Sequence, residues 1–195
     1  MLYLFIIGGS MLLIALLNIL YALPAFTDGG VLWVAISTTL GTVSVIAWDG
    51  LQAFLIRRLL PERMFSPGAP SFSVSKRERA FYRKLHVNEW KDLIPELGGF
   101  TNFHKSKFSS PSDAGYLGRF LLESNYGVAI HLANAVLGFL ILLLPWCSEL
   151  AIGLPIALVN LMLSLLPVVI LRFNTAPLRS LYLRSIKKTT TSTAP

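Results

Sequence analysis

The chain has 195 residues, of which 54% are hydrophobic and only 14% are charged, and its mean hydropathy is +0.63. A soluble domain usually carries about a quarter charged residues, so this composition excludes an ordinary soluble enzyme and predicts a membrane protein with one domain. A single cysteine, Cys147, excludes an intrachain disulfide and a cysteine-based metal site. The formal net charge is +7, but the positions of the charges favour a membrane surface over nucleic acid as the partner.

The basic residues are confined to two stretches of the chain. Twelve of the 17 lysines and arginines lie within 57–119, and the other five lie within 172–188. The short links at 22–30 and 146–152 carry none. By the positive-inside rule, the middle segment and the C-terminal tail are therefore cytoplasmic. With four spans, both termini are expected on the cytoplasmic side of a multi-pass protein of the cell membrane.

Four apolar segments are each long enough to cross a bilayer, which takes about 20 residues of helix. We expect transmembrane helices at 2–23, 31–56, 126–146 and 152–171. The first lacks both a preceding basic region and an A-x-A cleavage site, so we interpret it as a retained helix rather than a signal peptide. Asp49 lies within the second span, where a carboxylate is a functional candidate by default. The alternative is a hydrated side chain near the cytoplasmic interface.

A cytoplasmic, interfacial insert of amphipathic helices, residues 57–125, is expected between the second and third spans. Ser75 and Glu78 fit a capping box, so a basic helix should begin there, and a second short helix should begin at Asn88. These pieces are too short and too basic to cross a membrane, and they suit its surface. A later helix of the insert either merges with the third span or bends at 125–127.

The C-terminal segment is expected to leave the membrane after the fourth span. The run Arg172-Phe173-Asn174 should end that span, and Pro177 should prevent simple continuation of the helix. Residues 179–186 predict a separate amphipathic helix, and residues 189–195 predict a disordered tail.

Familiar catalytic motifs are absent from the sequence, which has no P-loop, dinucleotide fingerprint or GxSxG nucleophile elbow. His86 and His104 have 17 residues between them and no helical i,i+4 partner, so we expect no metal site. Trp90 is interpreted as an interfacial anchor or as a platform for a substrate. Polar and ionisable side chains gather around one predicted interface, and these are His86, Glu89, Lys91, Asp92, Glu96, His104, Lys105, Glu123, His131 and Asn134.

His131 is the candidate with the clearest chemistry, because it lies in a hydrophobic span near its cytoplasmic end. Histidine can take or give a proton near neutral pH, which suits activation of a hydroxyl for attack on a thioester. The alternative is a hydrogen bond to another helix that only holds the bundle together. Glu123 precedes it by eight residues, about 12 Å of rise and roughly 80° of rotation, so the two do not bond directly in a straight helix. Glu123 is expected to serve the other end of one site, to pair with a basic residue such as Lys91, or to remain a solvated carboxylate.

Several segments, taken together, resemble the glycosyl-diaponeurosporenoate acyltransferase family over roughly 57–184. They are RRLLP at 57–61, FYRKLHVNEWKDLIPE at 81–96, Glu123 with His131, and RFN at 172–174. Members of this family are small membrane acyltransferases, named for a step that esterifies a sugar on a carotenoid in staphyloxanthin synthesis. The resemblance implies acyl transfer to a hydroxyl and adds Trp90, Lys91, Glu123, His131, Arg172 and Asn174 as expected site residues. The chain departs from the family in its long apolar N-terminus and in RFNTAPLR at 172–179, so the acceptor is not taken to be a carotenoid glycoside.

The expected protein is therefore an all-α integral membrane O-acyltransferase that acts on a glycolipid or glycosylated isoprenoid. His131 would be the general base, Glu123 would orient a catalytic or basic group, and Lys91 and Arg172 would bind a phosphate or stabilise an oxyanion. No tightly bound cofactor is expected; an acyl donor such as acyl-CoA would be a co-substrate. The other partners would be membrane lipids and a lipid-linked hydroxyl acceptor, with oligomerisation left open. The residues expected to bind substrate are Trp90, Lys91, Asp92, His86, Lys105, Arg172 and Asn174.

The alternative is a non-catalytic partner or scaffold subunit of a lipid- or envelope-modifying enzyme, in which the same polar residues are structural. A transporter is disfavoured, because four spans with few intramembrane charges and no repeat offer little for a pathway.

Overall fold

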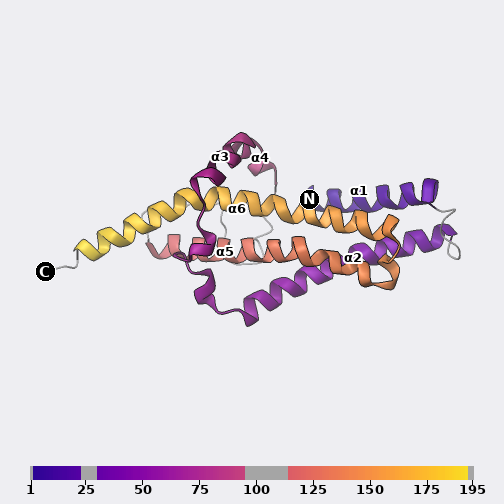
Figure 1. Cartoon of the computed structure of the whole chain (residues 1–195), viewed down its shortest axis with the longest axis horizontal. Coiled ribbons are helices and arrows are strands. Elements are labelled where there is room, and N and C mark those ends of the chain that lie inside the picture. The colour runs from indigo at the N-terminus through magenta and orange to yellow at the C-terminus, as the bar shows by residue number, and fades with distance from the viewer. Residues whose placement is uncertain (1, 23–29, 95–113, 193–195) are drawn as a thin grey trace. The chain divides into compact units, whose positions relative to one another are not determined.

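The computed structural model describes residues 2–22, 30–94 and 114–192, and every regular element in these ranges is helical (Figure 1). The long helices are α1 (Leu2–Leu17), α2 (Gly30–Leu59), α5 (Ala114–Leu137) and α6 (Leu150–Ser192). The short ones are η1 (Asn18–Ala22), η3 (Glu62–Phe65), η4 (Pro70–Phe72), α3 (Lys76–Lys84), α4 (Val87–Trp90), η5 (Lys91–Leu93), η7 (Gly138–Leu143) and η8 (Pro145–Cys147). Among the described residues, four helices are long and apolar enough to cross a membrane, which confirms the predicted all-α membrane fold.

The chain divides into two compact units that differ sharply in charge. The first unit comprises residues 1–55 and 130–165, and the second comprises 56–129 and 166–195. All 17 lysines and arginines belong to the second unit. The first unit is thus nearly free of charge, as a segment immersed in hydrocarbon must be. The prediction of one domain stays a prediction.

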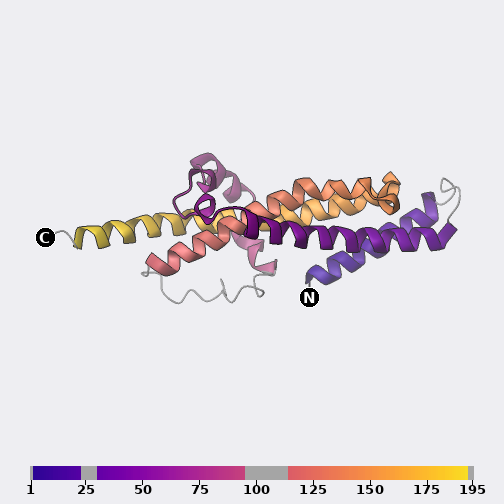
Figure 2. The ribbon, with the colours of Figure 1, turned by 90° about the horizontal axis from the view of Figure 1, so that it is seen from below.

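The first unit is built from α1, α2, the segment 130–147 and the first part of α6. Its core contains Ile14, Val45, Ile141, Cys147, Ile152, Ile156 and Ala157. The segment 138–147 and the start of α6 lie side by side in both ribbon views (Figures 1 and 2). A Cβ on Gly153 would collide with the carbonyl oxygen of Cys147, so only glycine permits this close approach. Many large apolar side chains of these helices are exposed, which is typical of surfaces that face lipid.

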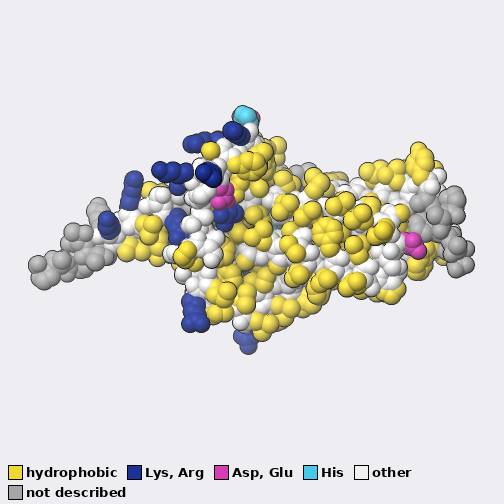
Figure 3. Space-filling model, viewed as in Figure 1, with side chains coloured by type: hydrophobic (Ala, Val, Ile, Leu, Met, Phe, Trp, Pro, Cys, Tyr) yellow, Lys and Arg dark blue, Asp and Glu magenta, His cyan; other side chains and the backbone are white. Residues whose placement is uncertain are grey.

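The second unit contains the short helices within 62–93, the last residues of α2, the start of α5 and the later part of α6. Ser75 caps α3, because its hydroxyl accepts a hydrogen bond from the backbone N–H of Glu78 at 3.1 Å. This contact confirms the predicted helix start. A small apolar core joins α5 to α6 and consists of Leu117, Phe120, Leu121, Leu178 and Tyr182. Figure 3 shows lysine and arginine side chains clustered on part of the visible face, beside extensive hydrophobic surface.

Two of the long helices extend beyond the predicted spans. Residues 114–125 open α5, so of the two alternatives for the later helix of the insert, merger with the third span is the observed one, with no bend at 125–127. Helix α2 continues past the predicted span to Leu59 and ends just before Pro61, which cannot continue it. The placement of the remaining insert at a membrane surface stays a prediction.

The predicted end of the last helix is wrong, because α6 continues through Pro177 to Ser192. An interior proline costs a helix about 3 kcal/mol. Leu178 and Tyr182 lie just beyond it and pack against α5, and this burial offsets the cost. The helix also includes residues 189–192, predicted as disordered tail, because extending an existing helix needs no new nucleus. The last residues of that tail, 193–195, lie outside the described ranges.

Candidate functional site

An ion-pair cluster in the second unit joins α3 to α6. Arg172 donates through Nε and Nη2 to the two carboxylate oxygens of Glu78, with Nη2 and Oε2 2.9 Å apart. Nη2 also donates to the carbonyl of Ser73 at 3.1 Å, and the hydroxyl of Tyr82 donates to Glu78 Oε1. The Arg172 and Glu78 side chains are only 17% and 23% exposed. Such a bidentate, largely buried pair fixes the start of α3 against α6.

The protonation states of this cluster follow from its geometry. The hydrogen bond from Arg172 is the main reason that the pKa of Glu78 lies below its ordinary value, against the opposing effect of burial. Burial, followed by the hydrogen bond to Glu78, raises the pKa of Tyr82 to about 12. Glu78 is therefore an ionised acceptor and Tyr82 a neutral donor at physiological pH.

Glu123, predicted as a catalytic residue, is paired with the end of α2. Arg57 Nη2 lies 2.8 Å from Glu123 Oε2, and the guanidinium carbon is 5.1 Å from the centroid of the Tyr126 ring. Tyr126 stacks on Phe65 at a centroid distance of 4.0 Å. Asn125 Nδ2 donates to the carbonyls of Phe65 and Ser66, at 2.9 and 3.2 Å. One turn of α5 thus holds the end of α2 and the following loop, and the basic partner of Glu123 is Arg57 instead of the suggested Lys91.

Lys91 lies beside the α6 segment that contains two other predicted site residues. Its ammonium group is 5.7 Å from the centroid of the Phe173 ring, within cation–π range. Phe173 lies between Arg172 and Asn174, and all three are half-buried. The structure therefore brings Lys91 to this segment, although η5 and α6 are far apart in sequence. Of the residues predicted to bind substrate, Lys91, Arg172 and Asn174 are thus brought close together.

The remaining predicted residues of the second unit surround the short helices α4 and η5. The Trp90 indole N–H donates to the carbonyl of Leu85 at 2.9 Å, which ties α4 to the end of α3. His86 is exposed and connects the two helices in a left-handed conformation, with φ 51° and ψ 36°. That conformation is uncommon outside glycine and makes the reversal between α3 and α4 a strained one. Asp92 is exposed. Lys105 lies outside the described residues, as do Glu96 and His104.

His131, the predicted general base, is half-buried on α5 in the first unit. A polar network lies one turn further along the same helix. Asn160 on α6 donates to Asp49 Oδ1 at 3.4 Å and to the backbone carbonyl of Asn134 at 3.3 Å. The side-chain oxygen of Asn134 is buried and, in the described part of the chain, has no hydrogen-bond partner. Asp49 is thus joined to other helices by an amide, and it is half-buried rather than fully hydrated.

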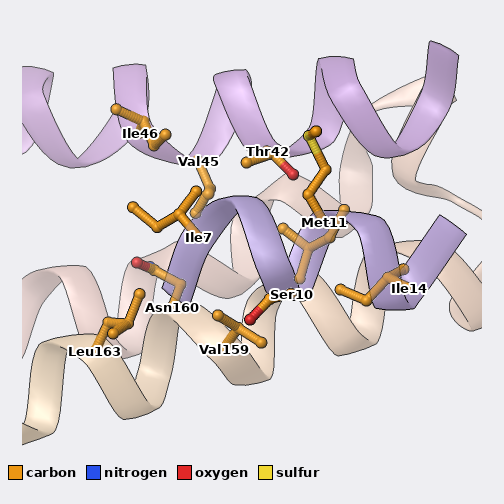
Figure 4. A pocket seen from close by; sticks show the side chains of 11 residues that line it. Ile7, Ser10, Met11, Ile14, Thr42, Val45, Ile46, Val159, Asn160 and Leu163 are labelled. Atoms are coloured by element: carbon orange, nitrogen blue, oxygen red, sulfur yellow. The ribbon is translucent and has the colours of Figure 1, made fainter. Parts of the chain in front are cut away.

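A small cavity lies beside this network, enclosed by α1, α2 and α6 (Figure 4). It has a volume of about 40 Å³, enough for a water molecule. Its lining is apolar except for Ser10, Thr42 and Asn160. Thr42 is committed to its own helix, since its hydroxyl donates to the carbonyl of Thr38 at 2.8 Å. The cavity is too small for a lipid chain.

Sequence reasoning missed several of these partners. It placed Glu78 only in a helix cap, and it named neither Tyr82 nor Asn160. An asparagine inside an apolar span is itself a signal of function or of helix pairing, so Asn160 could have been found. The pairing of Glu78 with Arg172 joins residues 94 positions apart and has no local sequence signature.

A family model described as glycosyl-4,4'-diaponeurosporenoate acyltransferase matches residues 61–184. That range includes Glu78, Lys91, Glu123, His131 and Arg172. No curated protein and no solved structure matches the chain.

Proposed function

Because this chain belongs to the glycosyl-4,4'-diaponeurosporenoate acyltransferase family, we propose that it is a membrane O-acyltransferase acting on a glycolipid or a glycosylated isoprenoid. The acyl donor would be an activated thioester such as acyl-CoA, used as a co-substrate. The observation that carries the proposal is the family match over 61–184, a range that contains both the polar residues of the second unit and His131.

The proposed reaction exchanges one ester for another. The acceptor hydroxyl oxygen attacks the thioester carbonyl carbon, a C–O bond forms and the C–S bond breaks. His131 accepts the hydroxyl proton as the attack proceeds and returns it to the departing thiolate, so no other co-reactant is needed. A half-buried imidazole suits this role, because it can exchange protons while bulk water is largely kept from the thioester.

Residues of the second unit are proposed contacts for the donor. Lys91 is held near α6 by Phe173 and can contact a phosphate of the donor or the developing oxyanion. Arg172 has its charge balanced by Glu78, so we assign it to positioning the 172–174 segment. Glu123 is likewise a positioning residue in this scheme, because its carboxylate holds Arg57. Trp90, His86, Asp92, Lys105 and Asn174 remain proposed substrate contacts.

The proposed site is on the cytoplasmic face of the cell membrane, with both termini cytoplasmic. The positive-inside rule supports this orientation, because the second unit holds every lysine and arginine of the chain. Cytoplasmic acyl thioesters and membrane-bound acceptors could meet there. Basic residues would also attract anionic lipid headgroups.

The test is mass spectrometry of lipids from cells that express the intact protein, His131→Ala, Leu132→Ala or no protein. Leu132 neighbours His131 on α5 and is exposed, so its substitution controls for general damage to the helix. We expect an ester-linked acyl lipid with the intact protein and with Leu132→Ala, and none with His131→Ala. Mild alkaline hydrolysis should release the acyl chain and identify the acceptor.

Two outcomes would contradict the proposal in different ways. Full product formation by a folded His131→Ala protein would remove His131 from the mechanism while leaving the activity in place. Identical lipids in all four cultures, with the protein present and folded, would favour the non-catalytic partner instead.

A further inference from the structure

A groove in the first unit is separate from the polar residues described above. It has a volume of about 520 Å³, within the usual range for a small-molecule site. One wall comes from α2 and the other from the segment 138–147. Its lining consists of Ser44, Ala47, Trp48, Leu51, Leu140, Ile141, Leu143, Leu144 and Trp146.

The groove presents hydrocarbon, because the polar atoms of its wall are bonded elsewhere. The Trp48 indole N–H donates to the carbonyl of Leu137 at 3.0 Å. The Trp146 indole N–H donates to the hydroxyl of Ser44 at 3.2 Å. Both bonds also join α2 to the stretch 137–146. A ligand in the groove therefore meets ring surfaces and aliphatic side chains, which favours a hydrocarbon chain over a headgroup.

The backbone of the second wall gives the groove a fixed form. Helix α5 ends at Leu137, a six-residue 3₁₀ helix, longer than most, begins at Gly138, and Leu144 is then extended. Only glycine fits at position 138, where the change occurs, because a Cβ there would collide with the Asn160 side chain. A Cβ on Gly41 of α2 would come within 2.7 Å of Cys147 Sγ, at the end of the second wall. This close packing between the two walls favours a preformed hollow.

The volume indicates the length of the chain that fits. A cavity of about 150 Å³ holds the six carbons of benzene, so about 520 Å³ holds roughly twenty carbons. This matches one fatty acyl chain of ordinary length. We propose that the groove between α2 and 138–147 binds the acyl chain of the donor and so sets the length of the chain transferred. This inference rests on the proposed acyltransferase function and specifies its donor.

Substitutions within the groove should change the preferred chain length in opposite directions. Ala47→Phe adds six carbons to the lining from α2, and Leu140→Ala removes three from the other wall. With the full-length protein in vesicles and a series of saturated acyl thioesters, we expect Ala47→Phe to move the optimum to shorter chains by about two to six carbons. Leu140→Ala should move it to longer ones. Val43→Phe is the matched control, because Val43 is 57% exposed on the same helix and does not line the groove.

Photocrosslinking provides a second readout that does not require turnover. An acyl thioester with a diazirine at the chain end should label peptides containing 44–51 or 140–146, and excess unlabelled thioester should prevent this labelling. A diazirine phospholipid is the comparison, and its labelling should resist that competition. If Ala47→Phe fails to fold, Leu140→Ala and crosslinking of the intact protein decide the question.

The outcomes separate this inference from the proposed function. Normal transfer with the same chain-length profile in Ala47→Phe as in Val43→Phe would overturn the inference, since the groove would then hold only membrane lipid, while the acyltransferase activity would stand. If the intact protein transfers no acyl group, the proposed function fails. In that case, competition by unlabelled thioester for the crosslink would still identify the groove as an acyl site. Labelling that resists this competition would show that the groove is not an acyl site.

Discussion

The pair formed by Glu78 and Arg172 should contribute measurably to the stability of the protein. Exposed ion pairs contribute about 0.2–1 kcal/mol, and loss of one partner from a fully buried pair costs about 3–5 kcal/mol. With side chains 17% and 23% exposed, this pair lies between the two cases. We expect Glu78→Gln to lower the free energy of unfolding by about 2 kcal/mol, because it leaves a largely buried guanidinium facing a neutral amide.

A double-mutant cycle isolates this interaction from other effects of the substitutions. Glu78→Gln, Arg172→Gln and the double variant should give a coupling energy of about 1–2 kcal/mol. Unfolding can be followed by tryptophan fluorescence as SDS is titrated into mixed micelles. Glu89→Gln removes an exposed acid nearby and should change stability by less than about 0.5 kcal/mol. A coupling below about 0.5 kcal/mol would show that the pair is effectively solvated and would refute this account.

Three further predictions use the same unfolding measurement. The pKa of Glu78 is lowered in the folded protein, so its contribution to the free energy of unfolding should be complete above its ordinary pKa of 4.5 and decline as pH falls through the lowered value. A stability difference between wild type and Glu78→Gln that grew on acidification would contradict this. Gly153→Ala should destabilise the protein by at least about 2 kcal/mol, because the added Cβ collides with a backbone carbonyl. Gly50→Ala, where the added Cβ meets no atom within 4 Å, should stabilise it by about 0.5–1 kcal/mol. Equal effects of the two substitutions would refute the close packing at Gly153. Asn160→Leu should lower the free energy of unfolding by about 1–2 kcal/mol, because it leaves Asp49 without its amide donor, and Asp49→Asn should lower it less. A larger loss from Asp49→Asn than from Asn160→Leu would exclude this pairing.

The four apolar helices could be predicted because length and hydropathy are local properties of a sequence. Their ends could not, because packing between distant segments decided them. Pro177 is a clear helix-breaking signal, and it was overridden by Leu178, which packs on a helix that begins more than 60 residues earlier. The cap at Ser75 was predictable, since both of its members lie within four residues of each other.

The candidate site was predictable by residue type but not by pairing. The sequence identified Glu123 as a carboxylate that needed a basic partner, yet several arginines and lysines were available, and only the fold selects Arg57. For Asp49 the sequence left a functional and a hydrated interpretation open. The structure adds an amide from Asn160, 111 residues away, which periodicity could not indicate.

The buried thiol of Cys147 makes the chain a natural background for site-specific labelling. It is the only cysteine, and its side chain is 0% exposed, so a bulky thiol reagent should not reach it in the folded protein. A cysteine introduced at an exposed position such as Asn88 or Ser148 would then be the sole accessible thiol. Applied to intact cells, a membrane-impermeant maleimide should modify Ser148→Cys and spare Asn88→Cys if the positive-inside orientation is correct. Because the packing excludes solvent from the Cys147 sulfur, labelling of these introduced cysteines reports the orientation of the protein in the membrane.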